Sequence, residues 1–211
     1  MTIDTININT YFDKIFYINL EKDVARNEHM ISEFTKFGIT NFERIDAIVL
    51  REITTPDTYR NFIKKEPKYV LGSLSCRASH IKCITTAKER GYSKVLILED
   101  DISFLNDPSE LLVKNAATLT EWDMLYFGGL IEPHFRNQIV GGYAYAVNSS
   151  LFDNIVYMAA ASGMEIDNFY AKILQHMSYN YNASGRYNVK IITPFNAIAH
   201  KFVFNSNIQM E

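Results

Sequence analysis

The segment KVLILEDD, residues 94–101, joins a continuous apolar run to three carboxylates. Its centre, VLIL, shows no alternation of apolar and polar residues, which is typical of a strand buried on both faces in the middle of a parallel sheet. Such sheets carry helices on both faces, and ligands bind beyond the carboxyl ends of their strands. The segment therefore predicts an α/β fold with a ligand site close to Glu99, Asp100 and Asp101.

Strand-like and helix-like patterns alternate along the rest of the chain. Short apolar runs predict strands at 14–20 and 42–48, and helical spacing of apolar residues predicts helices over 21–38 and 73–90. The stretch 49–70, rich in Arg, Lys, Thr and Pro, is expected to be a long loop that could cover a binding site. Further elements are expected as follows: a helix at 109–119, strands at 123–127 and 142–147, helices at 149–160 and 167–178, and a strand at 189–193.

Length and composition limit the class of protein. With 211 residues, of which 47% are hydrophobic and 21% charged, we expect a single domain with its own core. The formal net charge of −3, without a block of Lys and Arg, argues against nucleic-acid binding. No run of about twenty apolar residues and no signal-peptide pattern occurs, so we expect a cytoplasmic protein without a transmembrane segment. Cys76 and Cys83 lie too far apart on the expected helix to bridge each other.

The three carboxylates form the candidate chemical site. Adjacent like charges repel, and burial raises the cost of ionising all three unless a cation compensates. Mg²⁺ and Mn²⁺ prefer carboxylate oxygens and phosphate oxygens, which implies a phosphorylated substrate. On an extended backbone, Glu99 and Asp101 share a face and can converge on one ion, while Asp100 points elsewhere. The alternative is an acidic turn with solvated charges.

Four blocks resemble, in this order, glycosyltransferase family 25, which includes lipopolysaccharide and collagen galactosyltransferases. They are FYINLEKDVAR at 16–26, FERIDAI at 42–48, CRASH at 76–80 and VLILEDDISF at 95–104. Weaker similarities follow in DMLYFGG at 123–129, GGYAYAVN at 141–148 and EIDNF at 165–169. The resemblance implies a fold of the GT-A type, with a Rossmann-like, mostly parallel central sheet and helices on both faces, in one domain over 1–211.

The same resemblance implies an activity. It is that of a metal-dependent, inverting glycosyltransferase that moves a hexose, galactose or glucose, from a UDP-sugar to a hydroxyl of a glycan, a lipid-linked saccharide or a protein. Mn²⁺ or Mg²⁺ would bridge the carboxylates and the donor diphosphate. The chain is about as long as a minimal GT-A core, so another subunit of a homo-oligomer could supply part of the acceptor site. The alternatives are a non-catalytic nucleotide-sugar-binding or scaffold protein and a Mg²⁺-dependent phosphohydrolase.

The resemblance also implies roles for residues at the strand ends. Asp101 would be a metal ligand, Glu99 would take the first position of the D-x-D pattern, and Asp100 would support the loop. The implied donor-binding residues lie at strand ends and on the helix before the acidic strand: Asn19, Leu20, Arg26, Asp46, Ala47, Arg77, Ser79 and His80. Alternatives are a solvent-facing role for Arg26 and plain packing for Ala47.

The Ser79-His80 pair could approach a diphosphate if its helix begins close to it. The alternative is a helix-interior histidine that bonds a neighbouring loop. Ser75 stands where the family often has glycine before the cysteine, which leaves the local backbone geometry open.

Two later residues complete the implied site. Asp167 matches a late aspartate of the family and would bind the acceptor and act as general base, although as an N-cap it would be structural, and a helix terminus would favour its ionised form. His200 would be a metal ligand beside Asp101 and Glu99, and the alternative is a structural histidine. Loops such as 49–70 and 130–140 are expected to set specificity.

Overall fold

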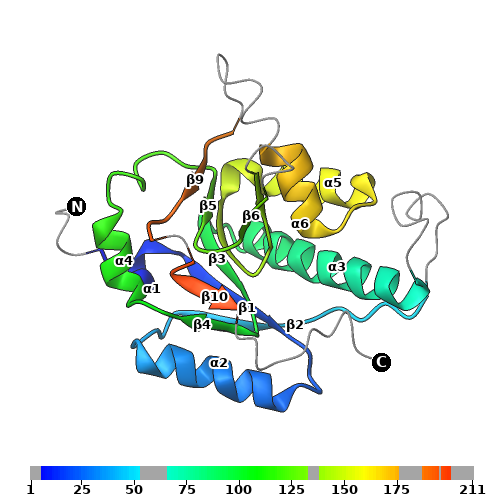
Figure 1. Ribbon diagram of the computed structural model, residues 1–211, viewed down its shortest axis with the longest axis horizontal. Coiled ribbons are helices and arrows are strands. Elements are labelled where there is room, and N and C mark those ends of the chain that lie inside the picture. The colour runs from blue at the N-terminus through cyan, green and yellow to red at the C-terminus, as the bar shows by residue number, and fades with distance from the viewer. Residues whose placement is uncertain (1–5, 53–65, 133–137, 176–186, 195, 201–211) are drawn as a thin grey trace.

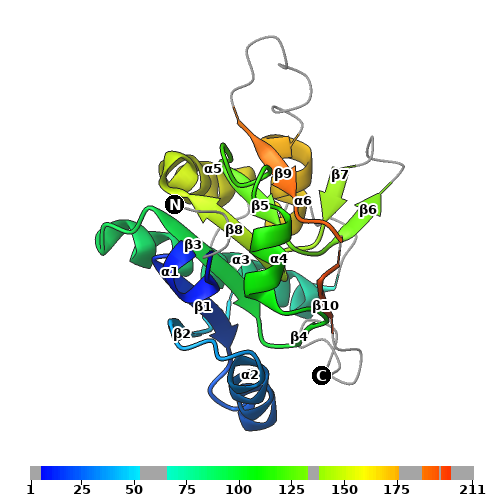
Figure 2. The same cartoon turned by 90° about the vertical axis from the view of Figure 1, so that its left-hand side faces the viewer.

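The structure is a computed structural model that describes residues 6–52, 66–132, 138–175, 187–194 and 196–200. Its centre is a six-stranded sheet in the order β2-β1-β3-β8-β5-β9 (Figure 1, with β8 labelled in Figure 2). The strands are β1 (Lys14–Asn19), β2 (Phe42–Asp46), β3 (Lys94–Glu99), β5 (Met124–Tyr126), β8 (Ala144–Asn148) and β9 (Val189–Ile191). Strands β2, β1 and β3 are parallel, as are β5 and β9, whereas β8 is antiparallel to both neighbours. The expected mostly parallel sheet is confirmed.

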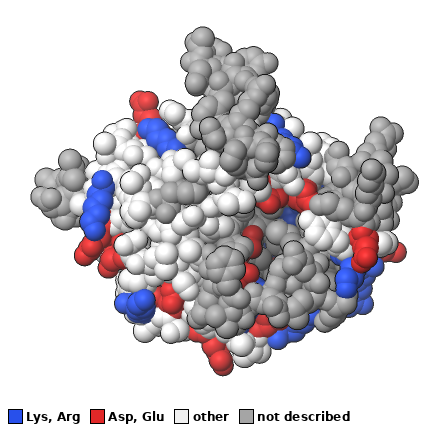
Figure 3. Space-filling view, in the orientation of Figure 1, with Lys and Arg blue, Asp and Glu red and all other residues white. Residues whose placement is uncertain are grey.

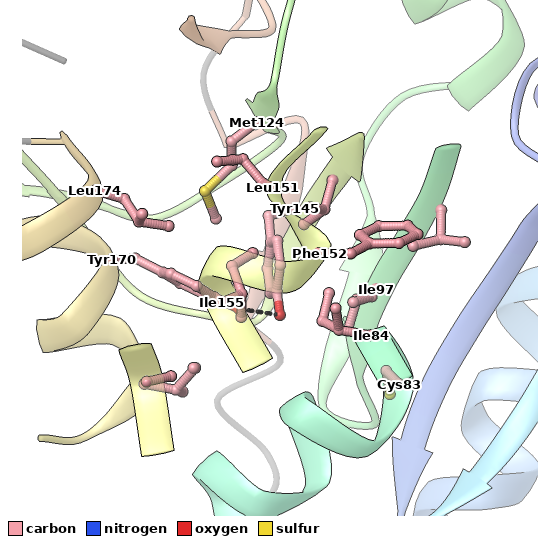
Figure 4. Close-up of a cluster of buried hydrophobic side chains, with 14 of the residues drawn as sticks. Cys83, Ile84, Ile97, Met124, Tyr145, Leu151, Phe152, Ile155, Tyr170 and Leu174 are labelled. Carbon is pink, nitrogen blue, oxygen red and sulfur yellow. Dashed lines mark hydrogen bonds between the residues drawn. The ribbon is translucent and has the colours of Figure 1, made fainter. Parts of the chain in front are cut away.

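Helices cover both faces of the sheet (Figures 1 and 2). On one face lie α1 (Ile8–Tyr11), α2 (Val24–Lys36) and α4 (Pro108–Lys114). On the other lie α3 (Pro67–Glu89), α5 (Phe152–Ser162) and α6 (Ile166–Phe169), with the 3₁₀ turn η4 (Ser149–Leu151) and the π-helical turn η5 (Tyr170–Gln175). Figure 4 shows part of the core on this second face, including Tyr145 and Cys83.

Strand β3 is buried on both faces, as its apolar run predicts. Val95 and Ile97 pack into the core under α3 and α5, whereas Leu96 and Leu98 pack into the core under α2 and α4. This division follows from the period of two along a strand. Both cores depend on β3, so the register of β3 against its neighbouring strands is fixed. That register in turn fixes the position of the carboxylates that follow β3 at the edge of the sheet.

Strands β1, β2 and β3 end at the same edge. In the sheet register Asn19 lies opposite Asp46, and Ile18 lies opposite Glu99. The polar side chains that follow each apolar strand are thereby brought to one edge, as the sequence predicts.

Two small ladders lie beside the sheet. Strand β4 (Ile102–Phe104) pairs antiparallel with β10 (Ile198–His200), and β6 (Leu130–Glu132) pairs with β7 (Gln138–Val140). A side chain at Gly128 would come within 2.2 Å of the carbonyl oxygen of Ile198. The absence of a Cβ at Gly128 therefore allows β10 to pack there.

Some expectations need correction. Helix α3 begins at Pro67, so the expected loop 49–70 includes the first turn of a helix, with proline in the position that suits a helix start. The sequence also missed α1, β4, β6, β7 and β10, which are short elements without a clear period. Strand β8 runs antiparallel because it follows the β6–β7 hairpin without a crossover helix.

Residues 53–65 and 133–137 of the two expected specificity loops lie outside the described residues. None of the helices that the structure describes is long and apolar enough to cross a membrane.

Candidate active site

A cavity of about 630 Å³ opens at the shared edge of β1, β2 and β3. Its walls are formed by the ends of these strands, residues 46–50 and one side of α3. Acidic side chains are visible in a hollow of the surface in the space-filling view (Figure 3). Most of the predicted site residues line this cavity: Asn19, Leu20, Arg26, Asp46, Ala47, Ser79, His80, Glu99, Asp100 and Asp101.

Arg26 partly neutralises the acidic cluster. Its Nη1 lies 2.6 Å from Oδ1 of Asp100 and 3.2 Å from Oδ2 of Asp101. The Arg26 residue is 7% exposed, so the solvent-facing alternative is wrong. Two of the three carboxylates, Asp100 and Asp101, thus contact one guanidinium, a counter-charge that the sequence did not reveal.

Asp100 is held by two donors. Besides Arg26, Nδ2 of Asn19 donates a hydrogen bond to its Oδ2 at 2.7 Å. Burial raises the pKa of Asp100, although the hydrogen bonds from Arg26 and Asn19 oppose that shift. Asp100 therefore ties the ends of β1 and β3 together.

Asn19 connects the same edge to β2. Its Oδ1 accepts a hydrogen bond from Nη1 of Arg44 at 3.1 Å, and its backbone carbonyl accepts one from the amide of Ala47 at 3.0 Å. Arg44 in turn forms an ion pair with Asp46. Because Asn19 is 1% exposed and engaged on both sides of its amide, its main observable role is to fix the geometry of the edge.

Ser79 lies in the interior of α3, far from the helix start at Pro67. The condition under which it could approach a phosphate from a helix N-terminus is therefore not met. Its Oγ accepts a hydrogen bond from the amide of Ile48 at 2.8 Å, and Oγ of Ser75 accepts one from the amide of Leu50 at 3.0 Å. The two serines fasten residues 48–50 to α3 and so build one wall of the cavity. The helix is continuous through Ser75, which settles the backbone geometry there.

His80 is completely buried. Its Nδ1 is hydrogen-bonded to the hydroxyl of Tyr145 at 2.8 Å, and that hydroxyl is hydrogen-bonded to Tyr170 at 2.8 Å (dashed line in Figure 4). Its Nε2 faces Oε1 of Glu99 at 3.4 Å. The histidine is thus held by a buried tyrosine of β8 rather than by a neighbouring loop.

Arg77 does not line the cavity. Its Nη1 donates a hydrogen bond to the carbonyl of Met164 at 3.0 Å, and burial lowers its pKa. Arg77 therefore holds the turn before α6 against α3, and its side chain is directed away from the cavity in which the implied donor-binding role would place it.

Asp167 lies in the first turn of α6, and Glu165 occupies the N-cap position. Burial raises the pKa of Asp167, nearby Glu165 and Glu99 raise it further, and the amide of Asn168 and His80 lower it. Asp167 is therefore not the N-cap, so that alternative is wrong, and burial raises the pKa of Asp167 where a helix terminus would have lowered it. Asp167 does not line the cavity itself.

His200 ends β10, opposite Ile102 in the register, so its backbone runs beside the residue that follows Asp101. Its side chain lies outside the described residues, and metal ligation by His200 stays a prediction.

Cys76 is the functional candidate that the sequence analysis missed. It lines the cavity beside His80 and Glu99, and burial raises its thiol pKa well above the usual value. Its spacing of four from His80 on a predicted helix was a usable signal, because residues at that spacing share a face.

The geometry defines an α/β protein with an acidic cavity at the carboxyl edge of its sheet. The family model described as "Glycosyltransferase family 25 (LPS biosynthesis protein)" matches residues 12–145. The chain belongs to glycosyltransferase family 25, and its sheet and helices have the GT-A type of architecture expected of that family.

Curated relatives carry the same family name. A "Glycosyltransferase 25 family member" of Drosophila melanogaster is 28% identical over 128 residues, which cover 55% of this chain and 21% of that protein. The protein of the same name from Anopheles gambiae is 26% identical over 126 residues, covering 54% of this chain and 21% of the relative. The chain thus matches about a fifth of the length of these relatives.

The chain also matches solved structures at TM-scores below 0.5. A glycosyltransferase involved in the glycosylation of the major capsid of PBCV-1 is 10% identical, with a TM-score of 0.47 over 83% of this chain and 79% of that one. The 4-diphosphocytidyl-2C-methyl-D-erythritol synthase from Anaerococcus prevotii is 13% identical, with a TM-score of 0.44; the match covers 90% of this chain and 74% of that one.

Proposed function

We propose that this protein is a glycosyltransferase that moves a hexose from a UDP-sugar to an acceptor hydroxyl. The observation that carries the proposal is the cavity at the ends of three strands, large enough for a nucleotide sugar and lined by both Glu99 and Asp101. Ligands of open α/β sheets bind at this edge. Family membership supports the reaction class, and the nature of the donor and acceptor is our inference.

A divalent cation fits the acidic end of the cavity. Both oxygens of Asp100 accept hydrogen bonds, from Arg26 and Asn19, whereas Asp101 contacts Arg26 through Oδ2. Glu99 and Asp101 line the cavity and offer the oxygen ligands that Mg²⁺ and Mn²⁺ prefer. The ion would neutralise charge on the departing diphosphate. His200 is the natural third ligand, since its backbone pairs beside Ile102.

The acceptor hydroxyl would attack the anomeric carbon as the bond to the diphosphate oxygen breaks, with inversion. Its proton would pass to a carboxylate, for which Asp167 is our candidate. The raised pKa of Asp167 favours proton uptake nearer neutral pH, which suits a general base.

The first test is a thermal-shift panel of uridine and guanosine nucleotides and nucleotide sugars, each with and without Mn²⁺. A ligand at a hundred times its Kd stabilises the folded state by about 2.7 kcal/mol, or roughly 5–10 °C in a chain of this size. We expect such a shift with UDP-sugars and Mn²⁺, and a much smaller one with guanosine nucleotides. The absence of a shift with every nucleotide would contradict a donor site.

Asp167→Asn is expected to lower the transfer rate about a hundredfold or more at saturating donor, because the proton acceptor is lost. The UDP-sugar thermal shift should be unchanged, since the proposed partner of Asp167 is the acceptor hydroxyl and not the donor. Asp153→Asn, the same chemical change in an exposed ion pair with Lys88, is the control. A variant with the normal transfer rate would exclude Asp167 as general base.

One contact favours a second candidate, a nucleotide-sugar-binding protein without turnover. Nη1 of Arg26 lies 3.2 Å from Oδ2 of Asp101, so the guanidinium already neutralises part of the negative charge that a metal cation would balance. A UDP-sugar shift that does not depend on Mn²⁺, with no transfer or donor hydrolysis, would support this candidate.

A further inference from the structure

Cys76, His80 and Glu99 converge in the wall of the cavity. Cys76 and His80 lie four residues apart on one face of α3, and Glu99 ends β3 beside them. One potential ligand atom from each, a thiol sulfur, a ring nitrogen and a carboxylate oxygen, lies within 4.8 Å of the other two. A single ion could therefore touch all three side chains after small rotamer adjustments.

The His80 ring is arranged as metal-binding histidines usually are. Its Nδ1 is bonded to Tyr145, whose hydroxyl is bonded to Tyr170, so the ring cannot turn freely. Its Nε2 has no hydrogen-bond partner within the part of the chain that the structure describes, although the residue is completely buried. A buried ring nitrogen without a hydrogen bond is costly, and a ligand at Nε2 would remove that cost. Metal-binding histidines commonly hold their second nitrogen in a hydrogen bond of this kind.

We propose that Cys76 Sγ, His80 Nε2 and the Glu99 carboxylate form a binding site for a borderline-soft divalent cation, Zn²⁺ in class. Thiolate and imidazole ligands select Zn²⁺ over Mg²⁺ and Mn²⁺. As the sulfur–metal bond forms, the thiol proton leaves to solvent, so a thiolate and a carboxylate balance the two charges of the ion. Three protein ligands leave a fourth position for water or a ligand oxygen from the cavity.

This site differs from the oxygen-ligand site proposed above but shares Glu99 with it. If the proposed function holds, Zn²⁺ bound at Cys76 and His80 would compete with Mn²⁺ for that carboxylate. Zn²⁺ should then suppress the Mn²⁺-dependent part of the UDP-sugar thermal shift. This consequence rests on the proposed function, whereas the Zn²⁺ site itself rests on the three side chains.

The direct test is titration of the full chain with Co²⁺, which replaces Zn²⁺ and reports a thiolate ligand by its charge-transfer absorption. No nucleotide is needed, so failure of the donor site and failure of this site are distinguishable. We expect a thiolate band that saturates at one equivalent of Co²⁺ and disappears when Zn²⁺ is added. Absence of the band in the wild-type chain would overturn the proposal.

Variants locate the site. Cys76→Ala should abolish the band, whereas Cys83→Ala should keep it, because Cys83 lies in the core and does not line the cavity. Tyr145→Phe, which removes the partner of His80 Nδ1, should weaken Co²⁺ binding about 10–100-fold.

If Cys76→Ala does not fold, Glu99→Gln provides the second test: it keeps the thiol and should weaken Co²⁺ binding. A band that is lost in Cys83→Ala, or that survives in Cys76→Ala, would place the metal elsewhere and contradict the assignment.

Discussion

Asp101→Asn is expected to lower the rate of hexose transfer about a hundred- to thousandfold, the usual effect of removing one well-placed charge-stabilising group. The change replaces a carboxylate by an amide of the same shape, so a cation that neutralises the diphosphate loses a charged ligand. The fold should survive, because Arg26 loses its contact with Asp101 but keeps the shorter one with Asp100, and removal of one negative charge relieves repulsion from Glu99 and Asp100. The measurement is transfer from a UDP-sugar at saturating Mn²⁺, together with the thermal-shift response to the same donor.

Asp153→Asn is the matched control, because it is the same chemical change in an exposed ion pair with Lys88, away from the cavity. It should leave both transfer and the donor shift unchanged. If Asp101→Asn transfers the sugar at the normal rate, the proposed cation site at the end of β3 is wrong. If it keeps the donor shift but needs more Mn²⁺ for transfer, Asp101 acts through the metal as proposed.

The sequence predicts the middle of the fold well because β3 carries a strong signal. Four apolar residues without alternation require two covered faces, and the two cores on either side of Leu96 and Ile97 meet that requirement. The acidic residues then emerge at the edge where β1 and β2 also end. Local pattern and global topology agree here, which is why both the strand and its ligand-binding end could be inferred.

Other features depend on distant contacts and leave no local signal. Strand β10 is three residues long, and its place depends on pairing with β4 and on the space left by Gly128. The direction of the Arg77 side chain depends on the carbonyl of Met164, which is far along the chain. The raised pKa of Asp167 depends on burial, whereas the sequence shows only a helix start.

Arg26→Met is expected to lower the free energy of unfolding at pH 7 by about 3 kcal/mol, near the lower end of the range for breaking a buried ion pair. Arg26, Asp100 and Asp101 are each less than a tenth exposed, so removal of the guanidinium leaves two buried carboxylates without their main counter-charge. Methionine keeps much of the apolar stem, so the loss reports charge more than packing. Urea unfolding measures it, with Arg90→Met in an exposed pair with Glu43 as control, for which we expect a much smaller change.

The pH dependence identifies the cause of that loss. Burial already raises the pKa of Asp100 in the folded wild-type chain, and without Arg26 the pKa should rise further. The folded variant then holds a proton more tightly than the unfolded chain, so its stability is greatest below the unfolded pKa of about 3.9 and falls as the pH rises through the folded pKa. The deficit relative to wild type should therefore be largest at neutral pH and shrink toward pH 4. Adding Asp100→Asn to Arg26→Met should recover part of the stability deficit at pH 7, because the two residues are in direct contact. The contrary result is a deficit that is the same at pH 4 and pH 7 and is not reduced by Asp100→Asn. Arg26 would then stabilise the fold by packing alone, and something other than its guanidinium would neutralise the acidic cluster.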